Sequence, residues 1–317
     1  MSPPAHQDAH HLKAQHRMGI AFMAVAAITF PIKDSFLKAQ DDAVPALLAI
    51  AIYFAMQIIF GFAGLTATRH PARRNPFAGM TRLHFMRSLT LTCALGTFFF
   101  SLRYVPLANA VTLYTLQGLF CIGFGRLLLA ERVLPRHIVL VAIASIGVMM
   151  VVRPEASGGS LALSLLPLLS GAFGGLYIIL TRKLGDHQPA FQLVCQDGAV
   201  SSITVLLVFM SSLLVTDSYF GTGSVPPMPT DMLTIFGPPA IAAAIGMISS
   251  LAMIRAAQLA PAVKLAPASY LEIASGAVIG IWIFGEYLDA MTIFGIAIIV
   301  AVCLTNSVMN ELAKTRG

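Results

Sequence analysis

One carboxylate stands inside an apolar stretch near the end of the chain. Glu272 lies in the apolar segment 261–284, where an ionised carboxylate costs at least about 2.5 kcal/mol on insertion scales. Such a group faces a cavity or a partner, and it could bind a cationic amine or exchange a proton. Its neighbours at helical spacing are all small, namely Ala268, Ser269, Ser275 and Gly276. Small residues favour close helix packing or leave room for a ligand, and both interpretations stay open.

A second surface carries aromatic side chains. Gln117 lies in the apolar segment 107–129 and shares a helical face with Leu113, Tyr114, Phe120, Cys121 and Phe124. Such a stripe is more often packed core than binding wall. Placed opposite Glu272, however, it would suit a substrate with a cationic amine and an apolar or aromatic body. The candidate substrate-binding residues are Glu272, Gln117, Tyr114, Phe120, Phe124, Ser269 and Ser275.

Two charged residues near the end of the first apolar segment are candidates for a gate or a coupling site. Lys33 and Asp34 follow Pro31, which would kink a helix and free a backbone carbonyl. Adjacent helical residues diverge by about 100°, so we expect the two charges not to neutralise each other side by side. Lys33 could instead extend its amine to the membrane interface. Asp34 has a shorter side chain that is less able to reach the interface, and it is a candidate for an outer gate.

Three further charged residues lie near the starts of their apolar segments, on the side of the membrane opposite to Lys33 and Asp34. They are Arg87, Asp197 and Lys264. An Arg or Lys so placed usually anchors a helix at the interface. Alternatively the three groups form an inner gate, and no partner for Arg87 follows from the sequence. Glu131 and Glu286 each end a segment, and we expect them to fix loops and helix ends rather than bind substrate.

The elements that must position these residues are membrane helices. The chain has 317 residues, of which 57% are hydrophobic and 11% charged, with a mean hydropathy of +0.81. Apolar runs long enough to cross a bilayer recur throughout and predict an all-α, polytopic membrane protein with ten transmembrane helices. The predicted spans are 18–39, 44–66, 83–102, 107–129, 137–152, 161–180, 191–215, 234–254, 261–284 and 290–309.

The distribution of charge orients these spans. The net charge is +6, but the basic residues flank apolar spans, which argues against a nucleic-acid partner. With a cytoplasmic N-terminus, thirteen of the 20 basic residues fall in inside segments, three outside and four within spans. The sequence therefore predicts that both termini are cytoplasmic.

No pattern in the sequence indicates a metal or a cofactor. The four cysteines lie inside apolar spans without paired spacing, which argues against a disulfide framework or a cysteine metal site. No Gly-rich stretch ends in Lys-Ser or Lys-Thr, so we expect no direct use of ATP. Residues 1–17 are polar and His-rich, and we expect a solvated leader without a fold.

The chain repeats itself. "RYVPLANAVTL" from Arg103 and "RAAQLAPAVKL" from Arg255 begin 152 positions apart and share six of eleven residues. Units of five spans, joined in tandem, must cross the membrane in opposite senses. We therefore predict two inverted five-helix repeats, 18–155 and 156–309, followed by a cytoplasmic tail at 310–317. After a gap of three residues the alignment continues with an offset of 155, which puts Gln117 opposite Glu272 and Glu131 opposite Glu286.

The repeated motifs resemble those of the EamA family of the drug/metabolite transporter superfamily. They are "LAPAV" at Leu259, "SYLE" at Ser269 and "GE" at Gly285, with "LANAV" at Leu107 and "AE" at Ala130 in the first half. The resemblance implies a ten-span transporter of small metabolites, commonly an exporter of amino acids or related compounds. It also implies a central cavity lined by spans one, three, four, six, eight and nine.

The combined prediction is a secondary transporter, and not an enzyme, that works by alternating access in a bacterial inner membrane. We expect it to export an amino acid or related amine-bearing compound, with proton coupling through Glu272 as one option. The alternative is an uptake carrier for a vitamin or metabolite. A membrane-embedded enzyme or a scaffold is a remote alternative. Substrate, direction, coupling ion and oligomeric state are left open by the sequence.

Overall fold

The computed structural model describes residues 5–40, 44–129, 135–152, 161–184, 188–219, 231–260, 265 and 268–315. The described part is helical and contains no strand. The elements in chain order are α1 (Ala5–Lys38), α2 (Ala46–Ala67), η1 (Pro71–Arg74), α3 (Arg82–Ser101), α4 (Leu107–Tyr114), α5 (Gln117–Leu129), α6 (Pro135–Val152), α7 (Leu161–Ser164), α8 (Leu166–Leu184), α9 (Ala190–Tyr219), α10 (Met232–Leu259), α12 (Leu271–Phe284) and α13 (Ala290–Thr315).

Six helical segments in the described ranges are long and apolar enough to cross a membrane. They are Ala14–Lys38, Ala46–Ala67, Arg82–Ser101, Leu107–Leu128, Ala190–Ser212 and Met232–Leu259. Shorter apolar helices occupy Ala142–Val151, Leu271–Phe284 and Ala290–Val302. The prediction of an all-α membrane protein is therefore confirmed, while the count of ten spans and the side of each terminus stay predictions.

Two predictions about helix boundaries were wrong. The leader was expected to have no fold, but α1 begins at Ala5 and continues into the first span. Neither Gly nor Pro interrupts residues 5–18, and Ala, Gln, Leu and Lys are good helix formers. The segment 107–129 was expected to be one helix, but it is divided between α4 and α5 at Thr115 and Leu116.

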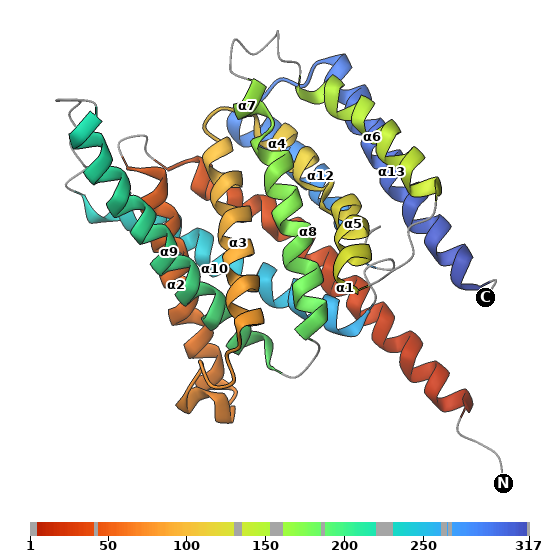
Figure 1. Cartoon of the computed structure of the whole chain (residues 1–317), viewed down its shortest axis with the longest axis horizontal. Helices are drawn as coiled ribbons and strands as arrows, with labels where there is room; N and C mark the ends of the chain where they lie inside the picture. The colour runs from red at the N-terminus through yellow and green to blue at the C-terminus, as the bar shows by residue number, and fades with distance from the viewer. Residues whose placement is uncertain are drawn as a thin grey trace.

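The helices pair across the two halves of the chain in a reciprocal way (Figure 1). Helix α1 packs on α10 while α3 packs on α8, and α1 packs on α12 while α4 and α5 pack on α8. Helix α2 packs on α9, and α6 packs on α13 at one edge of the molecule (Figure 1). Reciprocal pairing of this kind is what an inverted repeat requires. The repeat itself stays a prediction.

Prolines inside α1 and α10 free carbonyls that side chains from other parts of the chain then satisfy. Pro31 removes the donor to the carbonyl four residues earlier, and the Ala27 oxygen accepts a hydrogen bond from Ser275 Oγ of α12 at 3.1 Å. Pro238 likewise frees the Thr234 oxygen, to which Gln40 Nε2 donates at 2.8 Å. The carbonyl freed by Pro31 therefore joins α1 to α12.

Helices α6 and α13 approach most closely where two glycines meet. A Cβ at Gly295 would lie 2.9 Å from the Gly147 oxygen, and one at Gly147 would lie 3.0 Å from the Gly295 oxygen. Backbone cannot yield as a side chain can, and overpacking costs about 1–3 kcal/mol. We expect Gly295→Ala to lower the melting temperature of the purified protein. Gly123→Ala, where a Cβ has open space, should not lower it; equal losses in both variants would contradict the interpretation.

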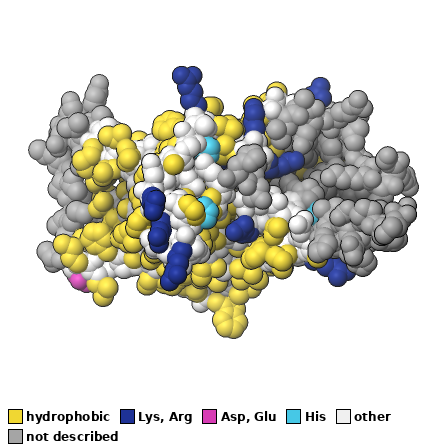
Figure 2. All heavy atoms as spheres, turned by 90° about the horizontal axis from the view of Figure 1, so that it is seen from below, with side chains coloured by type: hydrophobic (Ala, Val, Ile, Leu, Met, Phe, Trp, Pro, Cys, Tyr) yellow, Lys and Arg dark blue, Asp and Glu magenta, His cyan; other side chains and the backbone are white. Residues whose placement is uncertain are grey.

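The end of the bundle where α3 begins and α8 ends is basic. Arg69, Arg73, Arg182 and Arg255 are exposed there. Figure 2 shows this face from below, with Lys and Arg side chains spread across it and acidic side chains scarce. The distribution agrees with the predicted cytoplasmic side of the positive-inside rule. We call this the basic end, and the opposite end, where α1 ends, the Lys38 end.

Candidate functional site

A small cavity lies between helices of both halves. It has a volume of about 40 Å³, close to the roughly 30 Å³ that one water molecule occupies in the liquid. Its walls come from α1, α2, α3, α4 and α5 on one side and α8, α9 and α10 on the other. The polar residues of the lining are Tyr53, Gln57, Tyr114, Gln117, Tyr177, Asp197 and Ser250.

This lining corrects the cavity that the family resemblance implied. The spans expected to contribute included the ninth, but no described residue of α12 lines the cavity, whereas α2 and α9 do. Helix α2 crosses α9 closely, because a Cβ at Gly61 would lie 2.6 Å from Cys195 Sγ and one at Gly198 would lie 2.9 Å from the Phe54 oxygen. Gln57 of α2 and Asp197 of α9 both line the cavity.

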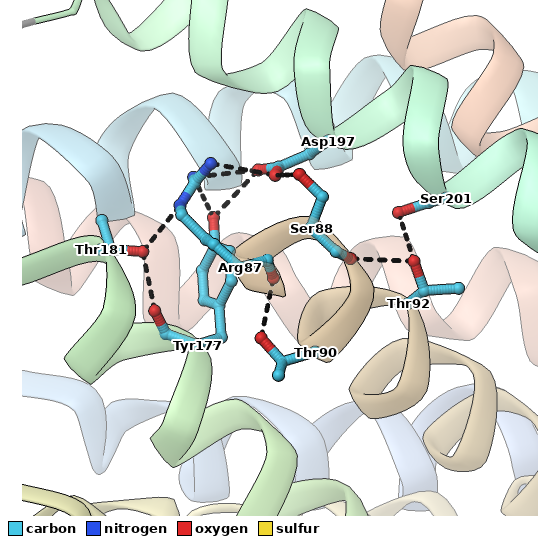
Figure 3. Close-up of polar contacts among 8 residues, drawn as sticks. All are labelled: Arg87, Ser88, Thr90, Thr92, Tyr177, Thr181, Asp197 and Ser201. Carbon is cyan, nitrogen blue, oxygen red and sulfur yellow. Dashed lines mark hydrogen bonds and ion pairs between the residues drawn. The ribbon is translucent and has the colours of Figure 1, made fainter. Parts of the chain in front are cut away.

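A buried ion pair includes one residue of the cavity wall, Asp197 (Figure 3). Arg87 has no exposed surface, and its guanidinium donates to Asp197 Oδ1 at 2.9 Å. A second nitrogen lies 2.9 Å from Asp197 Oδ2. The same guanidinium donates to Thr181 Oγ1 at 2.8 Å and to the Tyr177 hydroxyl at 2.7 Å. Three residues from two helices, α8 and α9, therefore fix one arginine.

Asp197 is equally well satisfied. It accepts a hydrogen bond from Ser88 Oγ at 2.7 Å and another from the Tyr177 hydroxyl at 3.2 Å. The interpretation of Arg87 as an interfacial anchor was therefore wrong, because its partners lie inward rather than at the surface. Sequence could not identify them, since Asp197 is 110 positions away. Arg87 and Asp197, two of the predicted gate residues, are joined in one cluster.

A second buried ion pair lies on α1. Lys33 and Asp34 are 1% and 3% exposed, and Lys33 Nζ donates to Asp34 Oδ1. The ammonium also lies 4.8 Å from the centre of the Phe99 ring and 5.8 Å from that of Tyr53, within cation–π range. The expectation that these neighbours would not pair was wrong. The long Lys33 side chain turns back because aromatic rings enclose it and leave Asp34 as the available carboxylate.

Glu272 is buried beside this pair. It is 4% exposed, and it interacts electrostatically with Asp34 and Lys33. Within the described part of the chain, no side chain or backbone group donates a hydrogen bond to its carboxylate. It lies in the first turn of α12 rather than in the middle of a span as expected. A helix N-terminus favours a negative charge, but two carboxylates here share one lysine.

Gln117 and Tyr114 flank the break between α4 and α5 and line the cavity. Three glycines of α8 permit this. A Cβ at Gly171 would lie 2.8 Å from the Tyr114 oxygen, and one at Gly175 would lie 2.9 Å from the Gln117 oxygen. A Cβ at Gly174 would instead meet side chains, at 2.8 Å from Gln117 Oε1 and 3.0 Å from the Tyr114 hydroxyl.

The other predicted site residues lie away from the cavity. Phe120 is half-buried against the core cluster that contains Leu116 and Tyr270, and Phe124 is half-buried on α5 outside the lining. Ser275 bonds α1 as described above, and Ser269 is half-buried just before α12. Lys264 lies outside the described residues.

Several lining residues were missed by sequence reasoning. Gln57 donates to the Ala243 oxygen at 3.1 Å and to the Tyr53 hydroxyl at 3.2 Å, while its Oε1 is buried without a partner in the described structure. A lone glutamine inside an apolar span was the available signal. Tyr53 and Tyr177 carried none, because a single tyrosine in a membrane span is common at interfaces.

The chain is similar to known proteins in sequence and in fold. Residues 17–153 match the model of the EamA-like transporter family. The pseudopaline exporter CntI of Pseudomonas aeruginosa strain UCBPP-PA14 is 24% identical over 301 residues, covering 92% of this chain and 96% of that protein. CntI of strain PAO1 is 23% identical with the same coverage. A crystal structure described only as that of a protein superposes with a TM-score of 0.60 at 16% identity, covering 96% of this chain and 98% of the other, and shares the fold.

Proposed function

We propose, from the premise that this chain is a transporter of the EamA-like family, that it moves a small amine-bearing metabolite across the membrane by alternating access. Its family and its apolar helices make it a multi-pass integral membrane protein and not an enzyme. Its apolar helices and its relatives from Pseudomonas aeruginosa indicate the bacterial inner membrane. We propose export as its direction, and pseudopaline, which its relatives export, is the first solute to test.

The observation that carries this proposal is the small cavity between the two halves. At about 40 Å³ it is too small for an amino acid, so the helices must separate to admit one. Its polar lining offers acceptors, among them Gln57 Oε1 and the Tyr114 hydroxyl. Aromatic rings of Phe30, Tyr53 and Phe54 complete the wall. Acceptors beside aromatic rings suit a cationic amine with an apolar body.

We further propose that Glu272 couples transport to protons. Glu272 and Asp34 are both buried, and Lys33 hydrogen-bonds to Asp34. With all three groups ionised, one negative charge stays uncompensated inside the membrane, which costs at least about 2.5 kcal/mol. A proton on Glu272 removes that cost. The charged and titratable groups that face this site are Lys33, Asp34, Tyr53 and Tyr114.

The test is solute flux in proteoliposomes under an imposed pH gradient. Glu272→Gln has nearly the same shape but cannot release a proton, so we expect stimulation of flux by the pH gradient to fall at least about tenfold. Asp231→Asn, an exposed helix cap, is the control and should retain stimulation. A folded Glu272→Gln variant with unchanged flux at every pH would refute the role of Glu272.

A further inference from the structure

A second pocket lies at the Lys38 end and belongs to no site described above. Its volume is about 190 Å³, about six times the share of one water molecule in the liquid. It is formed by the end of α1, the start of α2 and the end of α3. Two of its lining residues are cations, Lys38 and Arg103, and none of the lining residues that the structure describes is acidic.

Arg103 presents hydrogen-bond donors at this pocket. It is exposed, and one nitrogen of its guanidinium donates to the Val44 oxygen at 2.9 Å. Within the described part of the chain, the other guanidinium N–H groups bond to nothing. A guanidinium offers five N–H donors in a planar fork that matches the two oxygens of a carboxylate. The backbone contact holds the side chain at the pocket and leaves this fork available.

Lys38 is shared with an internal carboxylate. It is partly exposed, and its Nζ pairs with Glu286 Oε1. Glu286 also accepts hydrogen bonds from the first two backbone N–H groups of α4, at Leu107 (2.7 Å) and Ala108 (3.2 Å). One carboxylate therefore joins α1 and α4 of the first half to the loop after α12, which belongs to the second half.

The local backbone places Glu286 for this contact. Gly285 ends α12 with a φ of 61°, in the left-handed region that favours glycine. The Glu286 N–H then donates to the Gly280 oxygen at 3.0 Å, and the side chain passes over Gly280, where a Cβ would lie 2.4 Å from Oε2. Glu286 thus binds the start of α4, in agreement with the expectation that it fixes helix ends. In the "GE" motif, the glycine makes the turn and the glutamate makes the contact.

We propose that Lys38 and Arg103 form a carboxylate-binding site in this pocket, where the carboxylate of a solute competes with Glu286 for Lys38. A carboxylate bound between the two cations replaces the ion pair that holds α1 to the loop after α12. Glu286 then keeps its contacts with α4 but no longer pairs with Lys38 of α1. Solute binding and opening of the Lys38 end are thereby linked. The role in opening rests on the proposed transport function; the binding itself does not.

The test uses succinate as the probe, with dimethyl succinate and sodium chloride at equal ionic strength as controls. Melting temperature of the purified protein is measured as succinate is added. We expect succinate alone to raise it, and Arg103→Gln or Lys38→Gln to remove at least about half of the rise, each measured against its own baseline. Arg255→Gln is the matched control, since it alters the repeat-equivalent arginine at the basic end and should keep the rise.

Competition gives a second measurement. Glu286→Gln removes the negative charge that occupies Lys38, so succinate should bind severalfold more tightly to this variant. No rise with wild-type protein, an equal rise with chloride, or weaker binding to Glu286→Gln would each overturn the proposal. None of these results depends on flux, so the proposal can fail while the proton-coupling test with Glu272→Gln succeeds, and the reverse.

Discussion

Arg87→Met should be among the most destabilising single substitutions in the chain. It leaves Asp197 buried with only the neutral donors Ser88 and Tyr177, and breaking a buried pair by removing one partner costs about 3–5 kcal/mol. We expect a large fall in melting temperature and loss of transport. The double variant Arg87→Met with Asp197→Asn removes both charges, so it should be more stable than Arg87→Met alone.

The comparison separates a lost charge pair from lost packing. Arg82→Met lies on the same helix at an exposed position, and surface substitutions of this kind usually change stability by no more than about 0.5 kcal/mol. If Arg82→Met destabilised the protein as much as Arg87→Met, burial of the guanidinium would not be the cause. If the double variant were less stable than Arg87→Met, the negative charge left on Asp197 would not be the cause either.

Gly174→Ala should strongly reduce transport while the protein stays folded. The added methyl meets the free ends of two side chains, Gln117 Oε1 and the Tyr114 hydroxyl, and both line the cavity. These ends can move, so the fold survives, but the methyl then takes space where the solute must bind. We expect the ratio of maximal flux to the half-saturating solute concentration to fall at least about tenfold, which corresponds to about 1.4 kcal/mol.

Neighbouring glycines on the same helix provide the contrast. A methyl at Gly171 or Gly175 meets backbone oxygens of α4 and α5 at 2.8 and 2.9 Å, so these variants should lose stability. Gly96→Ala has open space and should leave both properties unchanged or raise stability slightly. Flux and melting temperature, measured on all four variants, check the distinction. A Gly174→Ala protein with normal flux would exclude Tyr114 and Gln117 from the solute path.

The candidate site was predictable as a set of residue types, but only in part as a set of contacts. Lys33, Asp34, Arg87, Asp197 and Glu272 stand out because charge in an apolar span is costly whatever surrounds it. Their partners do not stand out. Thr181 and Tyr177 are ordinary residues for a membrane helix, and a sequence does not record which helix they face.

The repeat also was predictable in part: the sequence aligned its residues but did not show where its helices break. Alignment of the halves placed Gln117 opposite Glu272, and both now lie in the first turn of a helix, α5 and α12. The break at Thr115 and Leu116 was not expected, because both residues fit an apolar helix. It is accommodated by α8, whose glycines allow the bent backbone of α4 and α5 to approach.

The sequence by itself determined that the chain lies in a membrane, that it is helical, and that each charge within an apolar segment is costly. These follow from composition and from runs of apolar residues, which depend on the chain alone. Only the tertiary structure decided that Arg87 turns inward to Asp197, that Lys33 folds back on Asp34, and that Glu286 reaches α4. Each of these choices depends on which helices cross and how closely. Crossing is set by small residues that meet across long separations in sequence, and no local pattern carries that information.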